Sequence, residues 1–281
     1  MPSVVVPAHN EERVIGRLLD GLLREACPGE IEIVVICNGC TDATAQAARA
    51  RGADVHVETT PVPSKIEALR LGDRLATGFP RLYIDADVEL TTRDVREICA
   101  ALEDPRVLAA APARVVPLAT SSWPVRAFYE LWQQLPLVRS GLFGRGVVAV
   151  SDVGHGRVAR LPDCMSDDLF LAESFAPHEC VVVPGARVIV HPPRTWADLL
   201  RRRTRAMAGN REARETAASS GRSRTTAAAI ASVVWHQPRL ALRLPVFVTT
   251  TVLARRRARA LRRAGNTAWL RDESSRGAVI S

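Results

Sequence analysis

The chain has 281 residues, enough for one large α/β domain or two small ones. Hydrophobic residues make up 47% and charged residues 24%, which excludes a chain that is disordered throughout. The formal net charge of +8 favours an acidic partner such as a phosphate group, nucleic acid or an anionic membrane. Of the 38 basic residues only Lys65 is a lysine, so the arginines reflect a compositional bias and their number says little about function.

The N-terminal residues and the cysteines indicate the cellular compartment of the protein. Residues 1–6 show neither the basic nor the apolar region of a secretory leader, and no uncharged apolar run reaches 18 residues. We therefore expect a cytoplasmic protein without a membrane-spanning helix. Four of the six cysteines are scattered, and Cys37 and Cys40 form a C-x-x-C without further zinc ligands, which is a weak signal for a metal or redox site.

Hydrophobic patterning alternates between strands and helices along the chain. A short apolar run predicts a buried strand at 3–7, and Asn10 is expected to cap the helix that follows. Further strands are predicted at 32–37, 53–58, 81–84, 147–150 and 187–190, and helices at 41–51, 64–76, 123–137 and from 195 onward. This alternation predicts βαβ units, and hence an α/β fold with a mostly parallel sheet between helices.

Polar clusters follow three of the predicted strands. His9, Asn10 and Glu11 come after the first strand, Asn38 with Thr41 and Asp42 after the second, and Asp85-Ala86-Asp87 after the fourth. Because parallel sheets bind ligands beyond the carboxyl ends of their strands, we expect these clusters to meet at one rim.

Glycine-rich phosphate loops are missing from the sequence, which disfavours a dinucleotide-binding Rossmann domain and a P-loop ATPase. A carboxylate-bound Mg²⁺ or Mn²⁺ would hold phosphate instead. We predict that Asp87 ligates the ion and that Asp85 shares it or contacts a ribose. The alternative is a pair of solvated turn acids, and the position after an apolar strand favours the metal site.

Five motifs in order resemble family 2 glycosyltransferases with the GT-A fold. They are residues 4–12, residues 37–42, Lys65 with Ala68 and Leu69, residues 85–87 as a DXD motif, and residues 166–169, and the resemblance extends over about residues 3–210. It implies a Rossmann-like, mixed and mostly parallel sheet flanked by helices. It also implies an inverting, hexosyltransferase-type enzyme that moves a sugar from a nucleotide diphosphate sugar to an acceptor hydroxyl with Mn²⁺ or Mg²⁺.

The resemblance also implies roles for individual residues. Donor-binding positions are Pro7, Ala8, Asn10, Glu11, Asn38, Lys65, Asp85 and Ala86; metal positions are Asp87, Asp85 and His191; and the acidic pair Asp167 and Asp168 carries the catalytic base, expected at Asp168. The ordinary alternatives are a strand-terminal histidine at His191 and helix-capping acids at the pair.

Lys65 is also singled out by the sequence itself. As the only lysine, opening a helix that faces the same rim, it is predicted to hold the donor site through the diphosphate or through Asp85, the alternative being chance survival at an exposed position.

Two departures from the family pattern bear on the donor base and on the type of enzyme. Cys37 and Asn38 stand where the family has two aspartates, which leaves UDP-linked and GDP-linked donors open. A Q-x-x-R-W motif is missing after the acidic pair, so no polymer synthase with its own membrane channel is implied. The acceptor is a carbohydrate, a lipid-linked molecule or a small molecule.

We expect residues 1–215 to form the GT-A domain, with a nucleotide-sugar half at 1–110 and an acceptor half at 111–215, and residues 216–281 to form a helical, basic C-terminal extension. One face of the helix predicted at 123–137 is expected in the core rather than against a sugar, and it carries Phe128, Leu131, Trp132 and Leu135. The glycines at 141, 144 and 146 are expected to lie near the acceptor or to form a plain turn.

Arginines at 255–263 are expected to form a solvated face or a peripheral contact with the inner face of an anionic membrane.

Two other functions fit parts of the sequence less well. A sugar-phosphate nucleotidylyltransferase needs a loop rich in glycine and basic residues after the first strand, where this chain has His9-Asn10-Glu11. A non-enzymatic, basic nucleic-acid-binding protein would use the arginine-rich tail, but it leaves the acidic rim unexplained, so no nucleic-acid partner is expected.

Overall fold

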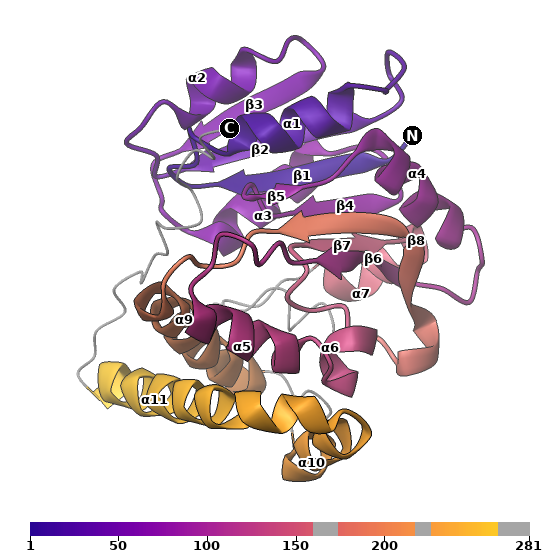
Figure 1. The fold of residues 1–281 in the computed structure, drawn as a ribbon. Coiled ribbons are helices and arrows are strands. Elements are labelled where there is room, and N and C mark those ends of the chain that lie inside the picture. Colours follow the sequence, from indigo (N-terminus) through magenta and orange to yellow (C-terminus); the bar gives the residue numbers. More distant parts are fainter. Residues whose placement is uncertain (160–173, 217–225, 264–281) are drawn as a thin grey trace. The chain divides into compact units, whose positions relative to one another are not determined.

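The computed structural model describes residues 1–159, 174–216 and 226–263 (Figure 1). The chain forms two compact units. The first, called the sheet unit here, comprises the described residues 1–115, 142–159 and 174–190. The second, the helical unit, comprises the described residues 116–141, 191–216 and 226–263. The functional division expected at residue 215 falls near the end of a long helix and stays a prediction.

A mixed sheet forms the centre of the sheet unit. Its strands are β1 (Ser3–Ala8), β2 (Glu32–Asn38), β3 (Val55–Thr60), β4 (Arg81–Ile84), β5 (Val88–Glu89), β6 (Ala109–Val115), β7 (Val147–Val150) and β8 (Cys180–Val190). Within the described residues their order is β3-β2-β1-β4-β7-β6-β8-β5. Strands β1 to β4 are mutually parallel, β7 is antiparallel to β4 and β6, and β8 is parallel to β6. The predicted α/β class is confirmed.

Both units contain helices. They are α1 (Ile15–Leu23), α2 (Thr44–Arg49), α3 (Lys65–Leu75), α4 (Thr92–Ala101), α5 (Trp123–Trp132), α6 (Pro136–Ser140), α7 (Asp152–Val158), α9 (Trp196–Thr216), α10 (Ala227–His236) and α11 (Leu244–Arg263), with 3₁₀ helices η1 (Pro177–Glu179) and η2 (Pro238–Arg243). Helices α1 to α4, α7 and η1 belong to the sheet unit, and the others belong to the helical unit.

Alternation along each central strand sends side chains to two cores, one on either face of the sheet. Val4 and Val6 pack with apolar residues of α1, α2 and α4. Val5 points the other way and packs with residues of α3 and α7. Strands buried on both faces have continuous apolar sequences, which is why their predicted positions are close to the observed ones.

Two predicted helices differ in the structure. Asn10 does not cap α1, because its φ of 51° is left-handed and the helix begins five residues later at Ile15. The helix predicted at 123–137 is interrupted between α5 and α6. Leu135 precedes Pro136 and is extended, as steric contact with a proline ring favours.

Strand β8 is longer than predicted, and it tolerates Pro184 and Gly185 by shifting register against β6 between Pro112 and Ala113. Only its last four residues were predicted from the apolar pattern, because proline and glycine resemble a turn in sequence.

The helical unit packs around aromatic side chains. The rings of Phe128 on α5 and Phe247 on α11 stack with centroids 5.1 Å apart, and Trp196 Nε1 donates to Thr250 Oγ1 at 2.9 Å. Phe128, Leu131 and Leu135 are buried, so the core role predicted for this face is confirmed for these residues. Among the described helices, none combines the length and the apolar composition needed to cross a membrane.

Candidate functional site

The carboxyl ends of β2, β1 and β4 lie next to one another at one edge of the sheet unit. The order β2-β1-β4 is parallel throughout, so Asn38, Ala8 and the turn after Ile84 end at the same rim. Pro7 and Ala8 are buried at the end of β1. The three polar clusters identified in the sequence are therefore brought to a single site.

Asn38 cross-links the two strands that lead into this rim. Its Nδ2 donates to the Ala8 carbonyl at 3.0 Å, and the side chain is almost fully buried. His9 Nδ1 lies 2.5 Å from the Asn38 carbonyl oxygen, so the loop after β1 is held against the end of β2. The predicted donor residue Asn38 thus has a clear positioning role.

The loop after β1 is bound to the loop after β2 by further hydrogen bonds. Asn10 Oδ1 accepts from the Thr41 amide at 2.7 Å, which uses its left-handed conformation. The Glu11 amide donates to Thr44 Oγ1 at 2.7 Å. Because backbone groups of both loops are engaged, Asn10 and Glu11, which are predicted to bind the donor, are held by residues some 30 positions away.

Cys40 joins the same loops through sulfur. Its Sγ accepts from the Asn10 amide and donates to the Ala8 carbonyl, both at 3.4 Å. A hydrogen bond from the Cys37 thiol and this amide lower the pKa of Cys40 to about 6, while the same thiol contact and burial raise the pKa of Cys37. The C-x-x-C, a weak signal in the sequence, therefore lies within the candidate site.

A short ion pair at the rim joins α3 to the turn after β4. Lys65 is the first residue of α3, which Ser64 caps by accepting from the Glu67 amide. Lys65 Nζ lies 2.6 Å from Asp85 Oδ1, with 26% and 32% of the two side chains exposed. The contact with Asp85 is one of the two predicted for this lysine, and its part in donor binding stays a prediction.

Gly146 supports the turn that carries the two aspartates. The Asp85 amide donates to the Gly146 carbonyl at 2.8 Å, and Gly146 has a φ of 67°. A Cβ at this position would lie 2.6 Å from Val88 Cγ1 and 3.2 Å from Asp85 Oδ2. The sequence suggested an acceptor segment or a plain turn here, and only the pairing of β4 with β7 reveals the contact with Asp85.

The donor set of this turn fits a hard divalent cation. Asp85 and Asp87 are half-buried and flank Ala86, which is 4% exposed. The described part of the chain contains no group of three or more His, Cys, Asp or Glu side chains that could hold a metal. Mg²⁺ and Mn²⁺ sites that bind a diphosphate need only one or two carboxylates, because phosphate and water oxygens complete the shell.

Three further residues are predicted to belong to the site. His191 belongs to the helical unit, where its carbonyl accepts from Arg202 Nη1 at 2.9 Å, and its metal role stays a prediction. Asp167 and Asp168, the predicted base and its neighbour, lie outside the described residues.

Comparison with known proteins places the chain in a family. The model of "Glycosyl transferase family 2" matches residues 3–159, more than half of the chain. A 4,4'-diaponeurosporenoate glycosyltransferase of Staphylococcus aureus strain USA300 is 33% identical over 99 residues, and that of the bovine strain RF122 is 40% identical over the same length. Each match covers 34% of this chain and 26% of the relative, so the matching region spans only about a quarter of these relatives.

The fold has a relative of known structure. The mannosyltransferase PcManGT from Pyrobaculum calidifontis, solved in complex with GDP-Man and Mn²⁺, superimposes with a TM-score of 0.63 at 21% identity. The superposition covers 94% of this chain and 76% of that one. Motif order, sheet topology and the family match agree, and the chain belongs to glycosyl transferase family 2.

Proposed function

We propose that the protein is an inverting glycosyltransferase that moves a sugar from a UDP- or GDP-linked donor to an acceptor hydroxyl, assisted by Mn²⁺ or Mg²⁺. The observation that carries this proposal is the Asp85-Ala86-Asp87 turn at the carboxyl ends of parallel strands, with Lys65 Nζ 2.6 Å from Asp85. Family membership supports the same activity.

Asp87, with Asp85, would hold the metal ion, which supplies charge stabilisation for the departing diphosphate when bound. Lys65 places a compact positive charge beside the same turn and orients Asp85. His9, Asn10 and Asn38 hold the two loops that would line the nucleotide. Ala86 leaves space for the donor because its side chain is a single methyl group.

The acceptor hydroxyl must lose a proton as it attacks the sugar carbon from the face opposite the diphosphate. A carboxylate on that face serves as the general base, and we assign this role to Asp168, with Asp167 next to it in the chain. We also propose His191 as a further ligand of the metal ion, because imidazole suits Mn²⁺.

The donor site is tested by ligand-dependent stability of the full-length protein. UDP or GDP with Mn²⁺ should raise the free energy of unfolding by about 2.7 kcal/mol at 100 times the dissociation constant. Asp87→Asn should remove the Mn²⁺-dependent part, whereas Asp104→Asn, which alters a carboxylate paired with the exposed Arg106, should keep it. Equal stabilisation of Asp87→Asn and the wild type would argue against the metal assignment.

The reaction itself is tested by release of nucleoside diphosphate from sugar donors. GDP-mannose is the first donor to examine, because PcManGT was solved with it, and UDP-glucose is the comparison. Proton NMR of the early product should show the anomer opposite to that of the donor. A product with the donor's configuration would exclude inversion, and release of pyrophosphate from a nucleoside triphosphate would indicate nucleotidyl transfer instead.

The base is tested by comparing Asp168→Asn with Asp167→Asn. Loss of the base should reduce turnover about 10²-fold or more while donor affinity is nearly unchanged. Normal turnover in Asp168→Asn would remove the assignment, and loss in Asp167→Asn alone would move the base by one residue.

A further inference from the structure

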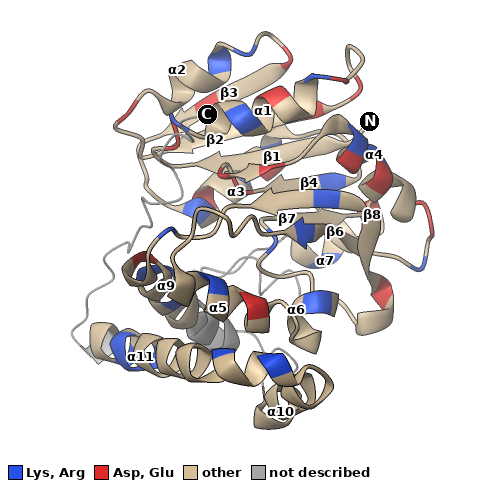
Figure 2. Cartoon of the chain, viewed as in Figure 1, with Lys and Arg blue, Asp and Glu red and all other residues tan. Residues whose placement is uncertain are grey.

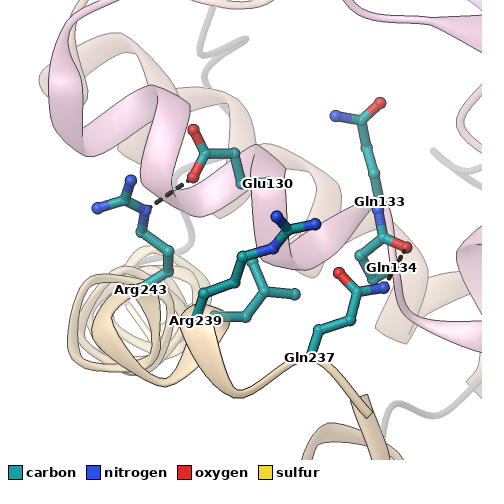
Figure 3. Close-up of a pocket in the computed structure, with 7 residues that line it drawn as sticks. Glu130, Gln133, Gln134, Gln237, Arg239 and Arg243 are labelled. Atoms are coloured by element: carbon teal, nitrogen blue, oxygen red, sulfur yellow. Dashed lines mark hydrogen bonds and ion pairs between the residues drawn. The ribbon is translucent and has the colours of Figure 1, made fainter. Parts of the chain in front are cut away.

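A polar pocket lies within the helical unit, formed by the C-terminal part of α5 and the segment that contains η2 (Figure 3). It has a volume of about 390 Å³, which falls within the usual range for small-molecule sites. Its polar lining residues are Glu130, Gln133, Gln134, Gln237, Arg239 and Arg243. The donor-site residues of β1, β2 and β4 take no part in it.

One cation of this pocket is neutralised by a neighbour and the other is not. Arg243 Nε donates to Glu130 Oε2 at 2.7 Å (Figure 3). Arg239 is exposed and makes no hydrogen bond or ion pair with any residue in the described parts of the chain. The two arginines and one glutamate give the lining a net charge of +1, which is carried by the Arg239 guanidinium.

The amide side chains add donors and acceptors for hydroxyl groups. Gln237 Nε2 donates to Gln134 Oε1 at 3.3 Å, as the dashed line in Figure 3 shows. That bond leaves Gln134 Nε2 and Gln237 Oε1 available to a ligand, since each amide has both a donor and an acceptor group. No lining residue is aromatic, so recognition by hydrogen bonds and charge is favoured over stacking on a sugar ring.

A guanidinium fork next to amide groups matches a phosphate that carries neighbouring hydroxyls. Arginine binds phosphate through paired N–H donors, and glutamine side chains exchange hydrogen bonds with hydroxyl groups. Leu240, which is 7% exposed, adds an apolar part to the lining that suits a carbon backbone. We propose that this pocket binds a glycerophosphate group.

Exposed apolar side chains beside the pocket point to a lipid headgroup as the source of that group. Trp235 precedes Gln237 by two residues and is 85% exposed, and Leu242 precedes Arg243 and is 76% exposed. Helix α11, which follows directly, carries arginines and no acidic residue, as the colouring of Figure 2 shows. Tryptophan and leucine next to basic residues are typical of surfaces that contact anionic membranes.

Two probes distinguish a lipid headgroup from a free metabolite. The full-length protein is titrated calorimetrically with glycerol 3-phosphate, and it is sedimented with vesicles of phosphatidylglycerol or of phosphatidylcholine. Arg239→Gln should weaken binding about tenfold to a hundredfold, the range for a lost charge-assisted hydrogen bond. Arg239 has no partner in the described structure, so this variant should fold as the wild type does.

Arg93→Gln is the matched control, since it removes the same charge from an exposed site on α4, outside the helical unit. Binding of glycerol 3-phosphate that depends on Arg239 and not on Arg93 supports the pocket with a free ligand. Sedimentation with phosphatidylglycerol alone, with the same dependence, supports it with a lipid headgroup. Failure of both probes to bind, or equal loss in the two variants, would overturn the proposal.

Discussion

The side chains of Lys65 and Asp85 meet at 2.6 Å, 20 positions apart in the chain. This contact joins the first residue of α3 to the turn after β4. It places the only lysine of a chain with 37 arginines beside a carboxylate that is two residues from another, Asp87. Because two carboxylates so close in sequence repel each other, the ammonium group of Lys65 offsets part of that repulsion.

Lys65→Ala should weaken Mn²⁺-dependent binding of nucleoside diphosphate about tenfold or more, because it removes a charge-assisted hydrogen bond from Asp85. Lys65→Arg should recover only part of the affinity, since a planar guanidinium does not replace a compact ammonium. Isothermal titration gives both constants. Arg74→Ala is the control, because it removes an exposed positive charge from the last turn of the same helix. Wild-type affinity in Lys65→Ala would show that the contact serves the fold alone.

Gly146→Ala should cost about 2–4 kcal/mol in the free energy of unfolding and also reduce donor binding. A left-handed φ costs an alanine roughly 1–2 kcal/mol, and the added Cβ would lie 2.6 Å from Val88 Cγ1. Gly29 has a similar φ of 73° but no atom near its Cβ position. Urea unfolding of Gly146→Ala and Gly29→Ala separates the cost of the left-handed φ from the cost of the steric contact. Equal losses of unfolding free energy in the two variants would mean that contact with the Asp85 turn contributes nothing.

Asp73 is expected to be the most sensitive carboxylate away from the candidate site. It accepts from Arg81 at 2.6 Å and from Tyr83 at 2.9 Å, and His155 Nε2 lies 2.8 Å away. Asp73→Ala should destabilise the fold by about 3–5 kcal/mol, because the Arg81 side chain is only 3% exposed and would lose its ion-pair partner.

Asp104→Ala should cost about 1 kcal/mol or less, because its partner Arg106 is 85% exposed. Thermal and urea unfolding should show the same order for the two variants. A loss of less than about 1 kcal/mol in Asp73→Ala would mean that water replaces the carboxylate.

Cys40 should react with iodoacetamide already near neutral pH. The thiolate is the reactive form, and the Cys37 thiol and the Asn10 amide lower the pKa of Cys40 to about 6. Labelling should therefore be close to its maximum at pH 7 and should fall as the pH drops through 6. Mass spectrometry of the Cys40 peptide follows the rate. A rate that still rises steeply from pH 7 to 9 would show that the lowered pKa is wrong.

The parts of the fold set by local pattern were predicted closely, and those set by distant contacts were not. Apolar runs located β1, β2 and β4, because strands buried on both faces need hydrophobic side chains throughout. The conformation of Asn10 depends on Thr41, and the environment of Gly146 depends on the pairing of β4 with β7, so neither can be inferred from nearby residues. The pocket at Arg239 needs α5 and η2 together, which no periodicity in the sequence indicates.

The pairing of strand β5 determines when the two aspartates can reach their final positions during synthesis. Val88 and Glu89 pair with Val190 and Ile189, about 100 residues later, and Gly146, which holds the Asp85 amide, follows about 60 residues after that turn. A ribosome needs on the order of 5–20 s to add 100 residues. Strands β1 to β4 can pair during that interval, whereas the two aspartates acquire their final positions only when the late strands β7 and β8 have emerged.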